Sequence, residues 1–197
     1  MLFRSATKAI RAAIGSDQIL SVKVRLGWEE KTFALDIADA VQQGGANEIS
    51  VHGRTKMDGY RADRIDWEKI GEIRRFLSIP VIANGEIFSW QDAQTCLAVT
   101  GCEDLMVARG ALQIPNLSEV IKHRAEPVAW HHILKLLHHY SQVENHWDSG
   151  FYHVARIKQW LRFLLKSYQE ADLLFEKIKG CSTSEELQWM LSRENEI

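Results

Sequence analysis

The chain has 197 residues, of which 46% are hydrophobic and 25% are charged, and its formal net charge is −2. This composition is that of a folded globular protein and excludes a largely disordered chain. The near-neutral charge excludes global attraction to a polyanion, so a nucleic acid would have to bind at a local basic patch. No apolar run approaches the roughly 18 residues of a membrane-spanning helix, so we expect no membrane partner.

The cysteine and histidine spacings predict neither disulfides nor a metal site. Cys96, Cys102 and Cys181 have no CxxC spacing, which favours free thiols in a reducing cytoplasm. The pairs His131-His132 and His138-His139 lie seven residues apart, about 10 Å along a helix, which is too far to chelate one ion. The N-terminal 15 residues are typical of an amphipathic helix rather than a secretory signal, although their Arg- and Ser-containing pattern leaves a transit peptide open.

Strand and helix patterns alternate along the first part of the chain. Helical spacing over 2–14 precedes an alternating, β-branched strand over 19–25, and the next helix ends at Gly44-Gly45. Three more strands are expected at 47–51, 81–83 and 104–108, with helices over 66–77 and from Ser89 through Val99, where Gly101 ends the helix. This alternation predicts an α/β fold with a parallel sheet.

The pattern changes from about Pro115, after which no strand is expected. Helical spacing is found over 129–145, 152–168, 170–179 and 184–192. Four β/α units are half of the eight in a TIM barrel, so we expect the C-terminal half of a (β/α)8 barrel at 1–117 and an all-helical domain at 118–197. Such a half barrel has open parallel edges, which predicts self-association through them and suggests the C-terminal part of a longer protein.

Polar residues follow each of the four predicted strands. The carboxyl ends of barrel strands form the active site, so we expect eight residues to gather on one rim: Lys23, Arg25, His52, Arg54, Asn84, Gly85, Arg109 and Gly110. A lysine there can lie beside an anionic ring or phosphate, His52 can donate to a carbonyl or phosphate, and glycine turns allow close approach of a phosphate. Each also has an ordinary structural explanation, such as a snorkelling lysine, a satisfied histidine or a common β-to-α turn.

The predicted helix over 152–166 has one apolar face and one basic face. Its cations are Arg156, Lys158, Arg162 and Lys166, with Tyr152, His153 and Trp160 nearby. Cations and aromatic rings on one helix can track phosphates and stack bases. A solvated helix face explains the same pattern equally well.

Five motifs together resemble the tRNA-dihydrouridine synthases. They are KVRLGW at 23–28, HGRTKMDGYRADRIDW at 52–67, IPVIANGEI at 79–87, RGALQIPNL at 109–117, and YHVARIKQWL at 152–161, the last being similar to the bacterial subfamily C. The resemblance covers residue 1 to about 180. It implies an FMN-dependent barrel followed by a helical tRNA-binding domain, with NADPH reducing the flavin. Hydride would then pass to C6 of a flipped-out D-loop uridine, U16 in this subfamily, and a cysteine would protonate C5.

The resemblance also implies roles for individual residues. Lys23 would contact the flavin pyrimidine and His52 would lie beside the flavin, while Asn84, Gly85, Glu86, Ala108 and Arg109 would hold the FMN phosphate. Tyr60 would lie near the RNA, and Arg156, Lys158 and Phe163 would belong to the recognition helix.

Two departures from the family pattern change the expectation. None of the three cysteines lies in the context of the family's catalytic cysteine, and Asp58 stands where the loop often has Gln. We therefore expect no catalytic residue in this chain and no uridine reduction by the chain alone. A non-enzymatic tRNA-binding remnant and a different phosphate-binding barrel enzyme are the alternatives.

Overall fold

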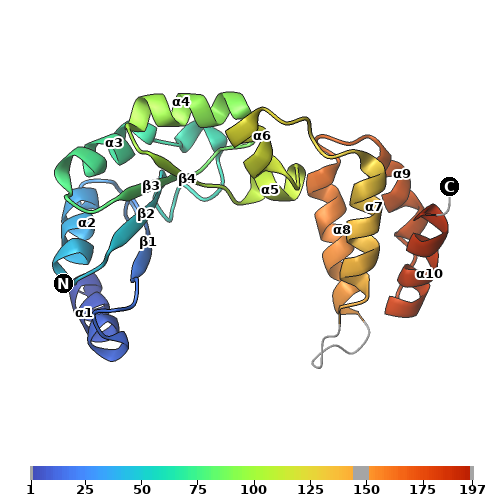
Figure 1. Ribbon diagram of the computed structural model, residues 1–197, viewed down its shortest axis with the longest axis horizontal. Coiled ribbons are helices and arrows are strands. Elements are labelled where there is room, and N and C mark those ends of the chain that lie inside the picture. Colours follow the sequence, from blue (N-terminus) through green and yellow to red (C-terminus); the bar gives the residue numbers. More distant parts are fainter. Residues whose placement is uncertain (1, 144–150, 196–197) are drawn as a thin grey trace. The chain divides into compact units, whose positions relative to one another are not determined.

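Alternating strands and helices build the first of two units, Met1–Ala108, and helices build the second, Arg109–Ile197 (Figure 1). The structure is a computed structural model and describes residues 2–143 and 151–195. Among these residues, no helix is both long and apolar enough to cross a membrane.

The sheet of the first unit has four parallel strands in the order β1-β2-β3-β4. Their bounds are Ser21–Arg25, Glu48–His52, Val81–Asn84 and Asp104–Met106. The register pairs Arg25 with His52, His52 with Asn84, and Asn84 with Met106, so the strands end side by side. The predicted α/β fold with a parallel sheet is confirmed, although β4 is two residues shorter than expected.

Side chains alternate between the two faces of this sheet. Val24, Ile49, Val51 and Ala83 are buried, and α2, α3 and α4 contact the strands. The strand positions that alternate with these buried residues face the other side of the sheet. They include Lys23, Ser50, His52 and Asn84. The polar residues of the strand ends thus lie together on one face of the sheet.

Local capping defines the ends of the helices in this unit. The helices are α1 Leu2–Ile14, α2 Ala34–Gln43, α3 Trp67–Phe76 and α4 Trp90–Thr100, with a 3₁₀ turn η1 at Ala62–Arg64. The Ser89 side chain accepts a hydrogen bond from the Asp92 N–H at 3.0 Å, and Gly101 adopts the left-handed conformation, with φ +66°, after α4. Both predicted signals of this helix are confirmed. Asp66 caps α3 in the same way through the Lys69 N–H.

The second unit consists of helices in its described residues. They are α5 Arg109–Gln113, α6 Leu117–His123, α7 Trp130–Ser141, α8 Tyr152–Leu164, α9 Glu170–Ile178 and α10 Ser184–Asn195. Leu137, Ile157, Leu161, Leu164 and Leu187 are fully or almost fully buried in its core. The helix predicted over 129–145 ends at Ser141, and positions 144 and 145 lie outside the described residues. Helix α6 was not predicted, because only Leu117 of its seven residues is buried and no apolar periodicity marks it.

Candidate functional site at the carboxyl ends of the strands

The side chain of Asn84 joins the ends of all four strands. Its Oδ1 accepts a hydrogen bond from Lys23 Nζ of β1 at 2.5 Å and lies 2.9 Å from His52 Nδ1 of β2. Its Nδ2 donates to the main-chain oxygen of Met106 in β4 at 2.6 Å. Three residues predicted from separate motifs are therefore brought into one cluster, in which Asn84 is buried, His52 is half-buried and Lys23 is exposed.

Burial and positive neighbours control the charges in this cluster. Burial lowers the pKa of Lys23, and the Arg25 guanidinium lowers it further. Burial also lowers the pKa of His52; the hydrogen bond to Asn84 opposes this effect, but nearby cations reinforce it. A histidine with a pKa below its ordinary value is neutral at pH 7.

The turn after Asn84 leaves no room for a side chain at Gly85. Gly85 has φ +123°, and a Cβ atom there would lie 2.6 Å from Ile65 Cδ1 and 3.3 Å from His52 Cε1. Glu86 follows with φ +55°, a conformation that non-glycine residues rarely adopt. The Trp67 indole N–H donates to the Gly85 oxygen at 3.1 Å and ties the turn to α3. Glycine is therefore needed at this position, because the side chains of Ile65 and His52 occupy the space that a Cβ atom would take.

A buried ion pair lies behind the turn. Arg54 is fully buried, and its Nη2 lies 2.7 Å from Glu86 Oε1. Among the described residues, none of the three Arg54 guanidinium nitrogens has a hydrogen-bond partner, so Glu86 contacts Arg54 as an ion pair. The prediction that Arg54 lies on the rim is therefore wrong, because its side chain is buried. Its guanidinium group faces the carboxylate of Glu86 instead.

The other rim residues have different surroundings. Arg25 Nη1 donates to the Thr55 oxygen at 2.9 Å, at the start of the loop that carries Tyr60. Ala108 is the last residue of the first unit, whereas Arg109 and Gly110 belong to α5 of the second.

The loop after β2 exposes Tyr60, whose relative exposure is 71%. Asp58 Oδ2 accepts hydrogen bonds from the Thr55 N–H and hydroxyl at 2.9 and 2.8 Å. The backbone bond from Thr55 is the largest effect that lowers the pKa of Asp58. Asp58, the residue that departs from the family pattern, thus serves to close its own loop.

Helix α8 presents Arg156 on its exposed side. The guanidinium carbon lies 5.3 Å from the centre of the Tyr152 ring, and Nη1 donates to Gln159 Oε1 at 3.0 Å. Phe163 is half-buried and follows seven residues later, about two turns, so it lies on the same side of the helix. Arg156, Tyr152 and Phe163 therefore form one stripe.

Lys158 does not belong to this stripe. Residues two apart on a helix point about 200° apart. Lys158 Nζ donates to the main-chain oxygens of Lys179 and Cys181, each at 2.8 Å, just beyond the end of α9. A cation at the carbonyl end of a helix is a favourable structural contact. Two of the three Lys158 donors are thus used within the fold.

Within the first unit, Cys96 lies inside α4 and Cys102 precedes β4, so neither lies at the carboxyl end of a strand. Burial raises the pKa of Cys96, inside α4, to about 12, and it also raises the pKa values of Cys102 and Cys181. Across residues 2–143 and 151–195, no group of three or more His, Cys, Asp or Glu residues is arranged to hold a metal ion.

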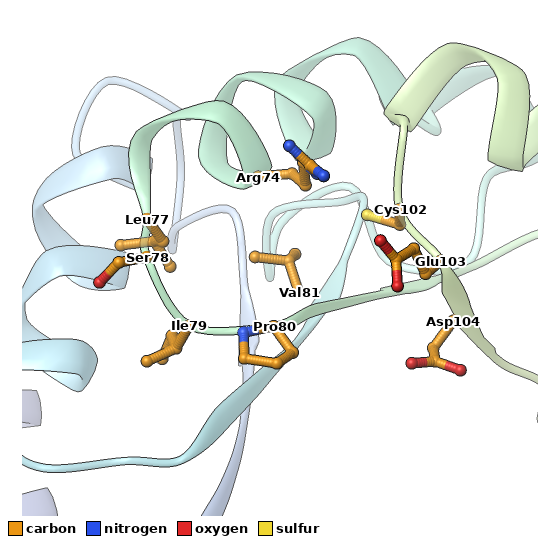
Figure 2. Close-up of a pocket in the computed structure, with 9 residues that line it drawn as sticks. All are labelled: Arg74, Leu77, Ser78, Ile79, Pro80, Val81, Cys102, Glu103 and Asp104. Atoms are coloured by element: carbon orange, nitrogen blue, oxygen red, sulfur yellow. The ribbon is translucent and has the colours of Figure 1, made fainter.

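A cavity of about 310 Å³ opens at the opposite ends of the strands (Figure 2). It is lined by the segment Leu77–Val81, which leads into β3, by Cys102 to Asp104, and by Arg74 of α3. Figure 2 shows Arg74 across the cavity from Glu103 and Asp104. Parallel β/α units carry their chemistry at the carboxyl ends of the strands, so we assign the candidate site to the Asn84 cluster.

Comparison with known proteins identifies the family. The chain matches the family model described as dihydrouridine synthase (Dus) over residues 1–193, and it belongs to this family. It is 63% identical over 191 residues to the tRNA-dihydrouridine(16) synthase of Haemophilus influenzae, covering 97% of this chain and 62% of that protein. The enzyme of the same name from Pasteurella multocida is 61% identical over 186 residues, covering 94% of this chain and 60% of that protein. The chain thus spans about 60% of the length of these relatives.

The buried ion pair behind the turn yields a stability prediction. Glu86→Gln leaves the Arg54 charge buried without its counter-charge, so we expect the free energy of unfolding to fall by about 3–5 kcal/mol. Urea denaturation followed by circular dichroism measures this loss. Glu176→Gln removes an exposed ion pair with Lys179 and is the matched control, with an expected loss below about 1 kcal/mol. Equal losses in the two variants would contradict the assignment.

The contacts of Lys158 predict that it supports the fold while Arg156 does not. Lys158→Met removes two hydrogen bonds to main-chain oxygens, so we expect a loss of about 1–2 kcal/mol in unfolding free energy. Arg156→Met, on the exposed side of the same helix, is the control and should leave the thermal midpoint unchanged. A stable Lys158→Met protein would show that these hydrogen bonds do not stabilise the fold.

Proposed function

We propose that this chain supplies flavin-binding and tRNA-binding parts of a tRNA-dihydrouridine synthase that acts at position 16 of the D-loop. The observation that carries the proposal is the family match over residues 1–193, together with relatives above 60% identity that bear this name. The four parallel β/α units support the further proposal that residues 1–117 form half of a TIM barrel and residues 118–197 a helical tRNA-binding domain. Because its substrate would be tRNA, we place the protein in the cytoplasm.

The strand-end cluster fits FMN by its chemistry. The Lys23 ammonium suits the pyrimidine edge of a reduced, anionic flavin, and the uncharged His52 beside it adds no further positive charge. By resemblance to the family, main-chain N–H groups of the Asn84–Gly85–Glu86 turn would hold the phosphate, with Ala108 and Arg109 contributing from their own segment. When bound, FMN reduced by NADPH would supply the hydride that uridine C6 receives.

In this proposal, residues of this chain bind and orient the flavin and the tRNA, and none of them protonates C5 of the uridine. Asn84 fixes the Lys23 ammonium, so that its charge stands in place before the reaction begins, as electrostatic stabilisation requires. The thiols of Cys96 and Cys102 are buried, and their raised pKa values make them poor acids. We propose that the proton for C5 comes from a group outside these 197 residues.

The proposed tRNA contacts are Tyr60 and the α8 residues Arg156, Lys158 and Phe163. The exposed Arg156 beside the Tyr152 ring offers both a phosphate partner and a stacking surface. Lys158 donates two hydrogen bonds to main-chain oxygens within the protein, so we assign the larger electrostatic contribution to tRNA binding to Arg156.

A segment exchange tests the proposed activity. In a strain lacking its own position-16 enzyme, we express the Haemophilus influenzae relative with its matching segment replaced by this chain. We expect dihydrouridine at position 16, measured by mass spectrometry of tRNA fragments. Lys23→Met in the exchanged segment should lower the rate by roughly 10²-fold or more, because the charge at the flavin edge is lost. Lys8→Met, an exposed lysine of α1, is the control, and absence of dihydrouridine in the unmutated chimera would refute the proposal.

The second test asks whether the 197-residue chain is active without the rest of the enzyme. Incubated with FMN, NADPH and unmodified tRNA, the 197-residue chain should form no dihydrouridine, because none of its cysteines lies in the sequence context of the family's catalytic cysteine. Product formation by the chain alone would contradict this expectation.

The helical unit should bind tRNA in a salt-dependent way. Arg156→Met removes one phosphate contact, so the slope of log K against log salt should decrease in magnitude by about one. Arg193→Met is a matched control, because Arg193 also lies over an exposed aromatic ring, Trp189, at 4.9 Å. Fluorescence anisotropy with labelled tRNA measures both slopes, and equal slopes for the two variants would exclude Arg156 as a specific contact.

A further inference from the structure

Two partners fix the orientation of the Asn84 amide, because one of them can only accept a hydrogen bond and the other can only donate one. The Met106 main-chain oxygen only accepts, so the side-chain atom facing it at 2.6 Å is the nitrogen. The Lys23 ammonium only donates, so the atom facing it is the oxygen. Both requirements give the same orientation, and the oxygen is therefore also the atom that faces His52 Nδ1.

This orientation determines which nitrogen of His52 carries the proton. Asn84 Oδ1 can only accept, so His52 Nδ1 must donate across the 2.9 Å contact. A neutral imidazole has one N–H, which leaves the lone pair on Nε2. A second proton is disfavoured by burial and by Arg25, Lys23 and Arg54, the cations that act on this ring.

We propose that Asn84 is a positioning residue that holds His52 in the neutral, Nδ1-protonated tautomer, so that His52 meets a ligand as a hydrogen-bond acceptor. His52 Nε2 is buried and has no hydrogen-bond partner among the described residues. A buried acceptor without a partner is unfavourable, and a donor hydrogen from a ligand would satisfy it. The choice of FMN as that ligand rests on the proposed function: its ribityl hydroxyls and ring N–H are donors, whereas its phosphate oxygens are acceptors. His52 thus contacts the sugar or ring part of the ligand, and the phosphate is held elsewhere.

Nitrogen NMR of the whole 197-residue chain, labelled with ¹⁵N-histidine, tests the tautomer without any ligand. We expect His52 to show a protonated Nδ1 and an unprotonated Nε2 at pH 7. His153 is an internal reference of the opposite kind, because its Nε2 lies 2.8 Å from the Val143 main-chain oxygen and must donate to it. His52→Gln assigns the signals by removing one set. A protonated Nε2 on neutral His52 would overturn the proposal.

Two substitutions at Asn84 show whether this residue is the cause. Asn84→Leu removes the acceptor, so His52 should lose its preference for Nδ1–H while His153 keeps its pattern. Asn84→Asp keeps an acceptor and adds a negative charge, so Nδ1 should stay protonated and the pKa of His52 should rise by about one unit or more. The aspartate variant decides the question if the leucine variant does not fold. An unchanged pKa in Asn84→Asp, or an unchanged tautomer in folded Asn84→Leu, would overturn the proposal.

Titration with FMN tests the acceptor role and separates it from the proposed function. On binding, the His52 Nε2 resonance should move towards that of a hydrogen-bonded acceptor while Nδ1 remains protonated. Bound FMN with an unmoved Nε2 resonance would overturn the acceptor role. If the chimera described above does not bind FMN either, the flavin assignment fails, and the ligand-free spectra still decide whether Asn84 sets the tautomer.

Discussion

The amide of Asn84 is the interaction on which the strand-end cluster depends. The Asn84 side chain contacts the adjacent strands β2 and β4 because the parallel register sets His52, Asn84 and Met106 side by side. It also contacts Lys23 of β1, one strand further away. A side-chain amide accepts at its oxygen and donates at its nitrogen, and the two atoms are fixed in one plane. It can therefore hold a cation and an imidazole at one atom and bind a carbonyl oxygen at the other.

Next to this amide, the fold holds a conformation that the local sequence would not adopt alone. Glu86 has a positive φ without being glycine, and such residues persist only where their surroundings determine them. The surroundings here are the fully buried Arg54 on one side and, through Gly85, the ring of Trp67 on the other. The shape of the turn is thus maintained by contacts from the loop after β2 and from α3, not by the turn itself.

The sequence predicts the features that are determined by residues close together in the chain, but not those that depend on residues far apart in it. The strands, the Ser89 cap and the Gly101 end of α4 follow from periodicity and from single residues, and all were predicted. The burial of Arg54 and the contacts of Lys158 depend on Glu86, Lys179 and Cys181, which lie far along the chain. Helix α6 escaped prediction because one buried leucine gives no periodic signal. The Lys23–His52–Asn84 cluster was expected from strand ends alone, but its hydrogen bonds needed the register.

Helix α8 shows why a count of basic residues is a weak argument for RNA binding. Arg156 and Lys158 are two residues apart, yet one extends over an aromatic ring at the surface and the other binds main-chain oxygens beyond a neighbouring helix. Their charges point about 200° apart and cannot act as one patch. Because the net charge of the chain is −2, the proposed attraction to a phosphate backbone would have to arise from local cations, and Arg156 between Tyr152 and Phe163 is the candidate on this stripe. Recognition of a folded RNA by such a stripe would depend more on stacking and on the placement of one cation than on overall charge.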